Sequence, residues 1–158
     1  MTARFFRPAI LGIGMLAMSG STYAADVKLS PQVLDLLRAE MREVSVGVQA
    51  MAFSIASADW RAMQDTSARI RASYIMEKKL TPAQARELET ALPPRFRVLD
   101  AEFHDRAGKL GAAAAAHDAK LVVAQYSRML ESCTTCHAAF ASSRFPNFSP
   151  GIVKAPRR

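Results

Sequence analysis

The chain has 158 residues and a formal net charge of +7, and half of its residues are hydrophobic. That length suits a single domain, and the apolar content is enough to build a buried core. The basic residues form no run interleaved with aromatic residues, so the charge gives no indication of nucleic-acid binding. A solvated surface, or one that faces an acidic partner protein, is the interpretation that we favour.

Residues 1–24 predict a cleavable secretory signal. Arg4 and Arg7 form a basic start, and the apolar run 10–18 that follows is too short to cross a bilayer. Small residues at Thr22 and Ala24 predict cleavage before Ala25; an uncleaved membrane anchor is the alternative. Cleavage would leave 134 residues with a net charge of +5 and no membrane span. In a bacterium this predicts a periplasmic protein.

The first helix is predicted over residues 31–57. Ser30 suits the N-cap position and Pro31 the first helical position. The apolar residues then recur in steps of three and four, which predicts a heptad stripe packed against other helices. This stripe consists of Leu34, Leu37, Met41, Val44, Val48, Met51 and Ile55.

A second helix is predicted from the N-cap Asp59 to Lys78 and Lys79, whose charges suit a helix C-terminus. Its predicted buried side consists of Trp60, Met63, Ile70 and Tyr74. The residues Thr81 to Gln84 form a capping-box pattern, which predicts a short helix that ends before Pro93.

Two further helices complete the prediction. One opens at Pro94, with Phe96, Leu99, Phe103, Ala107, Leu110 and Ala114 at helical spacing. The other follows the N-cap Asp118 and has Val122, Tyr126, Met129, Cys133, Cys136 and Phe140 on its buried face. Four long helices with short connections predict an all-α, antiparallel, up-down-up-down four-helix bundle over residues 25–144. Prolines and a glycine predict an irregular basic tail over residues 145–158.

The only two cysteines stand in the motif Cys133-Thr134-Thr135-Cys136-His137. The pattern C-x-x-C-H is the attachment signature of a c-type haem. Each thiol adds across a haem vinyl group, and the histidine that follows can bind the iron as its proximal ligand. The motif therefore predicts one covalent haem c near the C-terminal end of the fourth helix.

Other chemistries also use two cysteines at this spacing. A thioredoxin-like pair would lie near a βαβ pattern, and the sequence has no convincing strand. Structural zinc usually needs four ligands, and His104 and His117 lack zinc-finger spacing from the cysteines. A disulfide is compatible with an exported protein but leaves His137 unexplained. We expect His104 to be a half-buried structural histidine and His117 to be exposed.

A signal, four helices and C-x-x-C-H near the end of the last helix resemble the class II c-type cytochromes. This family includes cytochrome c′ and its low-spin, methionine-ligated relatives, and the resemblance covers nearly the whole mature chain. It implies that His137 is the proximal ligand and that the first helix supplies the residue over the other haem face. That residue is a methionine ligand in the low-spin members. In cytochrome c′ it does not bind the iron.

Helix geometry favours Met41 for this distal position. In an antiparallel bundle the start of the first helix lies beside the end of the fourth. His137 is about 9 Å from the end of its helix and Met41 about 15 Å from the start of the first, at 1.5 Å per residue. Met51 would be about 30 Å along, which is too far. Met76 is the second candidate, and core filling is the alternative role for Met41.

The resemblance also implies that Arg38 contacts a haem propionate, although an ordinary surface arginine is the alternative. Arg144 is a second, weaker candidate for the same contact. With His137 and Met41 bound, we expect a one-electron carrier rather than an enzyme. If Met41 only crowds an open haem face, we expect a cytochrome c′-like protein that binds NO or CO. A homodimer is compatible with the family.

Overall fold

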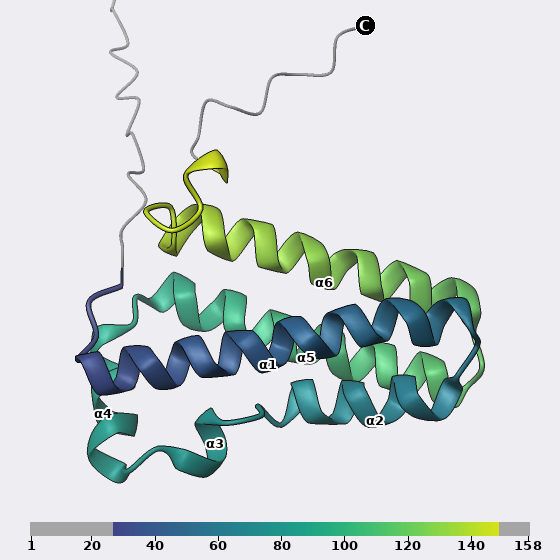
Figure 1. Cartoon of the computed structure of the whole chain (residues 1–158), viewed down its shortest axis with the longest axis horizontal. Helices are drawn as coiled ribbons and strands as arrows, with labels where there is room; N and C mark the ends of the chain where they lie inside the picture. The colour runs from purple at the N-terminus through teal and green to yellow at the C-terminus, as the bar shows by residue number, and fades with distance from the viewer. Residues whose placement is uncertain (1–26, 149–158) are drawn as a thin grey trace, which may run out of the picture.

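A computed structural model describes residues 27–148, and this part of the chain is all-helical with no strand (Figure 1). It confirms the predicted helical bundle. The elements are α1 (Pro31–Ala56), α2 (Trp60–Arg71), α3 (Met76–Lys79), α4 (Pro82–Ala91), α5 (Pro94–Ala115), α6 (Ala119–Phe140) and a 3-10 turn η1 (Pro146–Phe148). None of these helices is long and apolar enough to cross a membrane. The predicted signal, its cleavage site and the tail beyond residue 148 lie outside the described residues.

Three of the predicted helix starts are confirmed by their caps. Asp59 accepts a hydrogen bond from the N–H of Ala62 at 3.0 Å, and Asp118 accepts one from Leu121 at 2.9 Å. The capping box between Thr81 and its third following residue is complete in both directions. These side chains satisfy backbone donors that the first helical turn leaves unpaired.

Ser30 occupies the predicted N-cap position, but the predicted capping by its side chain was wrong. Ser30 precedes Pro31 as expected, but its side chain makes no capping bond within α1. Its N–H and its hydroxyl instead donate to the Glu87 carboxylate, at 2.6 and 2.9 Å. The start of α1 is therefore fastened to α4, which lies beside it at the same end of the bundle (Figure 1).

The second predicted helix is interrupted, contrary to expectation. It ends at Arg71, and Ser73 then adopts a left-handed backbone with φ of 51° before α3 begins. The cause is Glu40 of α1, whose carboxylate accepts the backbone N–H groups of Tyr74, Ile75 and Met76 at 2.8, 2.6 and 3.1 Å. These donors cannot also continue the hydrogen-bond ladder of α2.

The buried face of α1 differs from the predicted heptad stripe. It consists of Val33, Glu40, Val44, Gly47, Met51 and Ser54. Only Val44 and Met51 belong to both sets. Leu34 and Leu37 are half-buried, and Met41 is 40% exposed. At 3.6 residues per turn, these three lie roughly a quarter of a turn from the buried line, so α1 keeps an incompletely covered apolar flank.

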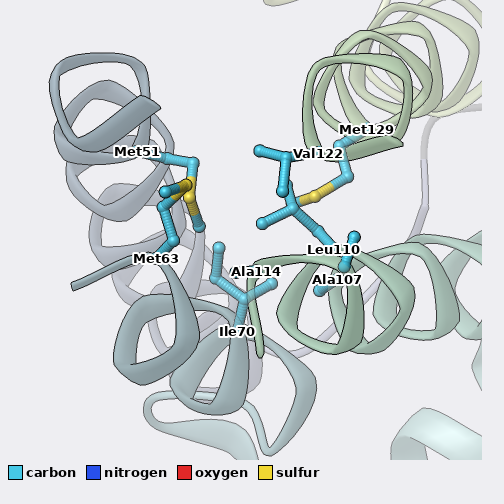
Figure 2. Packing of buried hydrophobic residues seen from close by; sticks show 9 residues of the cluster. Met51, Met63, Ile70, Ala107, Leu110, Ala114, Val122 and Met129 are labelled. Atoms are coloured by element: carbon cyan, nitrogen blue, oxygen red, sulfur yellow. The ribbon is translucent and has the colours of Figure 1, made fainter. Parts of the chain in front are cut away.

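The packed core occupies one half of the bundle. It joins the second half of α1, α2, the second half of α5 and the first half of α6 (Figure 2). Its members are Met51, Met63, Ile70, Ala107, Leu110, Ala113, Ala114, Val122 and Met129. The other half holds the starts of α1 and α5 and the end of α6 (Figure 1). There most large apolar side chains are only half-buried: Leu34, Leu37, Phe96, Leu99, Phe103 and Phe140.

We predict that Glu40→Ala lowers the free energy of unfolding by about 3 kcal/mol, because it leaves three backbone donors without their charged acceptor. Urea denaturation measures this loss. The matched control is Glu43→Ala on the exposed side of the same helix, which should change stability by about 0.5 kcal/mol or less. Equal losses in the two variants would contradict the role of Glu40.

Candidate haem attachment site at the end of α6

Helix α6 presents both motif cysteines on one face. Cys133 and Cys136 are one turn apart and differ by roughly 60° in direction around the helix axis. This face continues the line of Val122 and Met129, which are fully buried, but both cysteines are only half-buried. Both are free thiols, with no disulfide between them. Burial on α6 thus becomes incomplete where the motif begins.

The thiols are not activated as nucleophiles. Burial raises the pKa of Cys133, and burial together with the charges of Asp100 and Cys133 raises the pKa of Cys136 to about 11. Catalytic and redox-active cysteines need the opposite, a pKa lowered by positive charge or a helix N-terminus. The environment of this C-x-x-C pair therefore gives no support to a thioredoxin-like function.

His137 is suited to bind a metal as a neutral imidazole. Burial lowers its pKa, and the nearby charge of Arg144 lowers it further. Neutral imidazole is the form that donates a lone pair to a metal ion. Its ring stacks on Phe145 with centroids 4.4 Å apart and planes 14° from parallel. The chain that leaves α6 therefore turns back beside the motif and shields the ring.

The surroundings of the motif are largely aromatic and apolar. Phe96 of α5 contacts Phe140 of α6, with ring centroids 5.3 Å apart. Asp100, one turn further along α5, is close enough for its charge to act on the Cys136 thiol. Two thiols, one neutral imidazole and half-buried apolar side chains fit a flat apolar cofactor that is held at one edge. The residues present are thus compatible with a covalent haem.

The predicted distal residues lie in different settings. Met41 is in the half of α1 that begins at the motif end of the bundle (Figure 1), and it lies outside the packed core. Met41 therefore does not contribute to the packed core of the described residues. Met76 is the first residue of α3 rather than a late residue of α2, and Glu40 holds its N–H at 3.1 Å.

The two predicted propionate-binding arginines have other partners here. The Arg38 guanidinium lies 3.5 Å from the Asp35 carboxylate on the same exposed helix face. Arg144 lies over the Phe145 ring, 5.8 Å from its centroid. Exposed ion pairs are weak, so Arg38 can exchange this partner for another anion at little cost.

Two other residues have roles that the sequence did not predict. Glu40 had no assigned role, although the residue is 3% exposed and its carboxylate ties α1 to the start of α3. His104 is half-buried as expected, and its Nδ1 lies 2.7 Å from the Ile70 carbonyl oxygen of α2. Its Nε2 lies 3.6 Å from the Asp100 carboxylate. The spacing of four residues between Asp100 and His104 was the signal in the sequence that could have predicted this pair.

His117 is exposed, as predicted, and stacks on Trp60.

Comparison of the chain with protein families, with curated proteins and with solved structures gives no match. Within residues 27–148, no three His, Cys, Asp or Glu side chains gather in a way that could hold a bare metal ion. The motif and its surroundings are therefore the features from which a function can be inferred.

We predict that His104 stabilises the fold more in acid than in base. The Asp100 carboxylate, 3.6 Å from Nε2, raises the pKa of His104 above the ordinary value of 6.5, and burial only partly opposes this. The stabilisation is therefore complete below pH 6.5 and is lost as the pH rises through the folded-state pKa. His104→Gln should cost more stability at about pH 5.5 than at about pH 9, measured by urea unfolding. His117→Gln is the control, and an equal cost of His104→Gln at both pH values would refute the prediction.

Proposed function

We propose that the chain is an exported class II c-type cytochrome that carries one electron on a single covalent haem c. The observation that carries this proposal is the position of the C-x-x-C-H motif. It lies on the half-buried face of α6, in the half of the bundle where apolar side chains are incompletely covered. A haem would cover these side chains and leave the packed core of the other half unchanged.

Contacts between helices support the antiparallel arrangement that this proposal needs. Along α2 and α5, Trp60 stacks on His117 and the Ile70 carbonyl meets His104. Along α5 and α6, Phe96 contacts Phe140, whereas Arg106, further along α5, donates to the Ser132 hydroxyl at 2.6 Å. In both pairs, later residues of one helix meet earlier residues of the other. The start of α1 and the end of α6 accordingly share one end of the bundle (Figure 1).

Each residue of the proposed site has a distinct task. Cys133 and Cys136 would hold the cofactor by thioether bonds, and His137 would donate its neutral ring nitrogen to the iron. Met41 is the proposed distal ligand, with Met76 as the second candidate, and Arg38 and Arg144 are the proposed partners of the propionates. A haem bound in this way supplies reversible one-electron chemistry. Apolar residues around it would exclude water, and no catalytic group is required.

A second function is favoured by one observation. Met41 is 40% exposed and lies outside the packed core, so packing alone does not hold its sulfur in place. If the sulfur stays off the iron, the distal face is open to NO or CO, as in cytochrome c′. The chain would then bind a gas rather than carry electrons.

Location and partners follow from the same proposal. A periplasmic location rests on the sequence of residues 1–24, and the mild positive charge fits a redox partner with an acidic patch. Phe53 and Val46 of α1 are 77% and 63% exposed, which is compatible with a homodimer.

We predict that Met41→Ala converts the ferric holoprotein from low-spin to high-spin, because it removes the sixth ligand. Electron paramagnetic resonance at neutral pH measures the spin state, and a pyridine haemochrome assay first establishes the covalent haem. Met76→Ala is the matched control and should remain low-spin. A high-spin wild type would favour gas binding instead. If both variants stay low-spin, neither methionine is the ligand.

A further inference from the structure

Three ionisable side chains, Glu40 of α1 and Asp100 and His104 of α5, form a group in which both carboxylates act on the histidine. Glu40 of α1, with its carboxylate held by three backbone N–H groups, contributes one buried acid. Asp100 and His104 are four residues apart on α5, and their side chains lie 3.6 Å from each other. The charge of Asp100 acts both on His104 and on Cys136, one of the proposed haem attachment positions. His104 is thereby electrostatically close to the proposed site without belonging to it.

The His104 imidazole is placed to exchange a proton with solvent. Its Nδ1 lies 2.7 Å from the Ile70 carbonyl oxygen, which accepts only from a protonated nitrogen. The second nitrogen, Nε2, faces Asp100 at 3.6 Å, and the side chain is 21% exposed. The imidazole can therefore gain or lose its second proton on the Asp100 side without breaking its anchor to α2.

The charges around His104 come from each helix packed against it. Asp100 is on the same helix, and Glu40 faces it from α1. From α2, the Arg71 side chain packs against Gly108, one turn further along α5. From α6, Cys136 is affected by the same Asp100 charge, and a thioether bond would make this thiol unable to titrate. Because two carboxylates and only one guanidinium surround His104, the net charge favours its imidazolium form.

We propose that reduction of the haem iron raises the proton affinity of His104, so that the protein takes up part of a proton together with its electron. This inference rests on the proposed function. Reduction by the redox partner lowers the charge of the iron centre by one unit, and a less positive neighbour favours a protonated imidazole. The proton comes from solvent through the exposed part of the ring. Reoxidation returns the electron to the acceptor and the proton to water.

Potentiometry of the full holoprotein across about pH 5 to 9 tests this coupling, because that range brackets an ordinary histidine. The wild-type midpoint potential should fall with rising pH between the ferric and ferrous pKa values of His104. His104→Gln should abolish this slope, whereas the matched control His117→Gln, at an exposed position, should retain it. Asp100→Asn should move the sloping region to lower pH, because the carboxylate that favours the imidazolium is gone.

Nuclear magnetic resonance titration of the His104 ring gives a second readout that needs no variant. Its proton affinity should be roughly tenfold higher in the ferrous than in the ferric protein, because reduction removes one unit of positive charge from the proposed site and an interaction of about 1.4 kcal/mol corresponds to a factor of ten.

Equal His104 pKa values in the two oxidation states would overturn the proposal. A wild-type potential that does not change with pH, or an unchanged slope in His104→Gln, would overturn it as well. If His104→Gln fails to fold, the ring titration of the wild type decides alone. Failure of the proposed function is recognised separately, because the pyridine haemochrome assay would then find no covalent haem.

Discussion

The buried Glu40 carboxylate determines the arrangement of much of the bundle. Burying a charge is costly unless hydrogen bonds compensate for it, and here three consecutive backbone donors at the start of α3 do so. Those bonds end α2 early and turn Glu40 toward the α2–α3 connection. Because Glu40 faces this connection, α1 is oriented about its own axis so that Gly47 lies against the Tyr74 hydroxyl. This contact leaves no room for a larger residue at position 47. The orientation of α1 also directs Leu34, Leu37 and Met41 away from the packed core.

This orientation of α1 accounts for the unequal packing of the two halves of the bundle. In the half that holds Met51, Leu110 and Met129, apolar side chains from four helices exclude water (Figure 2). In the other half, apolar flanks of α1, α5 and α6 remain partly exposed. Each Å² of such surface that a cofactor covers would contribute about 25 cal/mol. A haem at the motif would therefore stabilise the half of the bundle in which apolar side chains are incompletely buried.

Local chemistry made parts of this structure predictable. The caps at Asp59, Thr81 and Asp118 depend on residues three positions apart, and the C-x-x-C-H motif is contiguous, so both are visible in the sequence. The buried face of α1 was not predictable from periodicity. A glutamate in an amphipathic helix ordinarily faces water, and only the donors near residue 75, distant in sequence, make burial of Glu40 favourable. The break after Arg71 has the same non-local cause.

The fold also gives two histidines of the motif half opposite protonation behaviour. His137 is desolvated at the end of α6 beside Arg144, and this lowers its pKa. His104 faces Asp100 and the charge of Glu40, and its pKa is raised although burial opposes the shift. A neutral imidazole is the form that can coordinate iron, whereas an imidazole with a raised pKa can hold a proton near neutral pH. The distribution of carboxylates and arginines over α1, α5 and the end of α6 thus gives the two histidines opposite pKa shifts within a few helical turns.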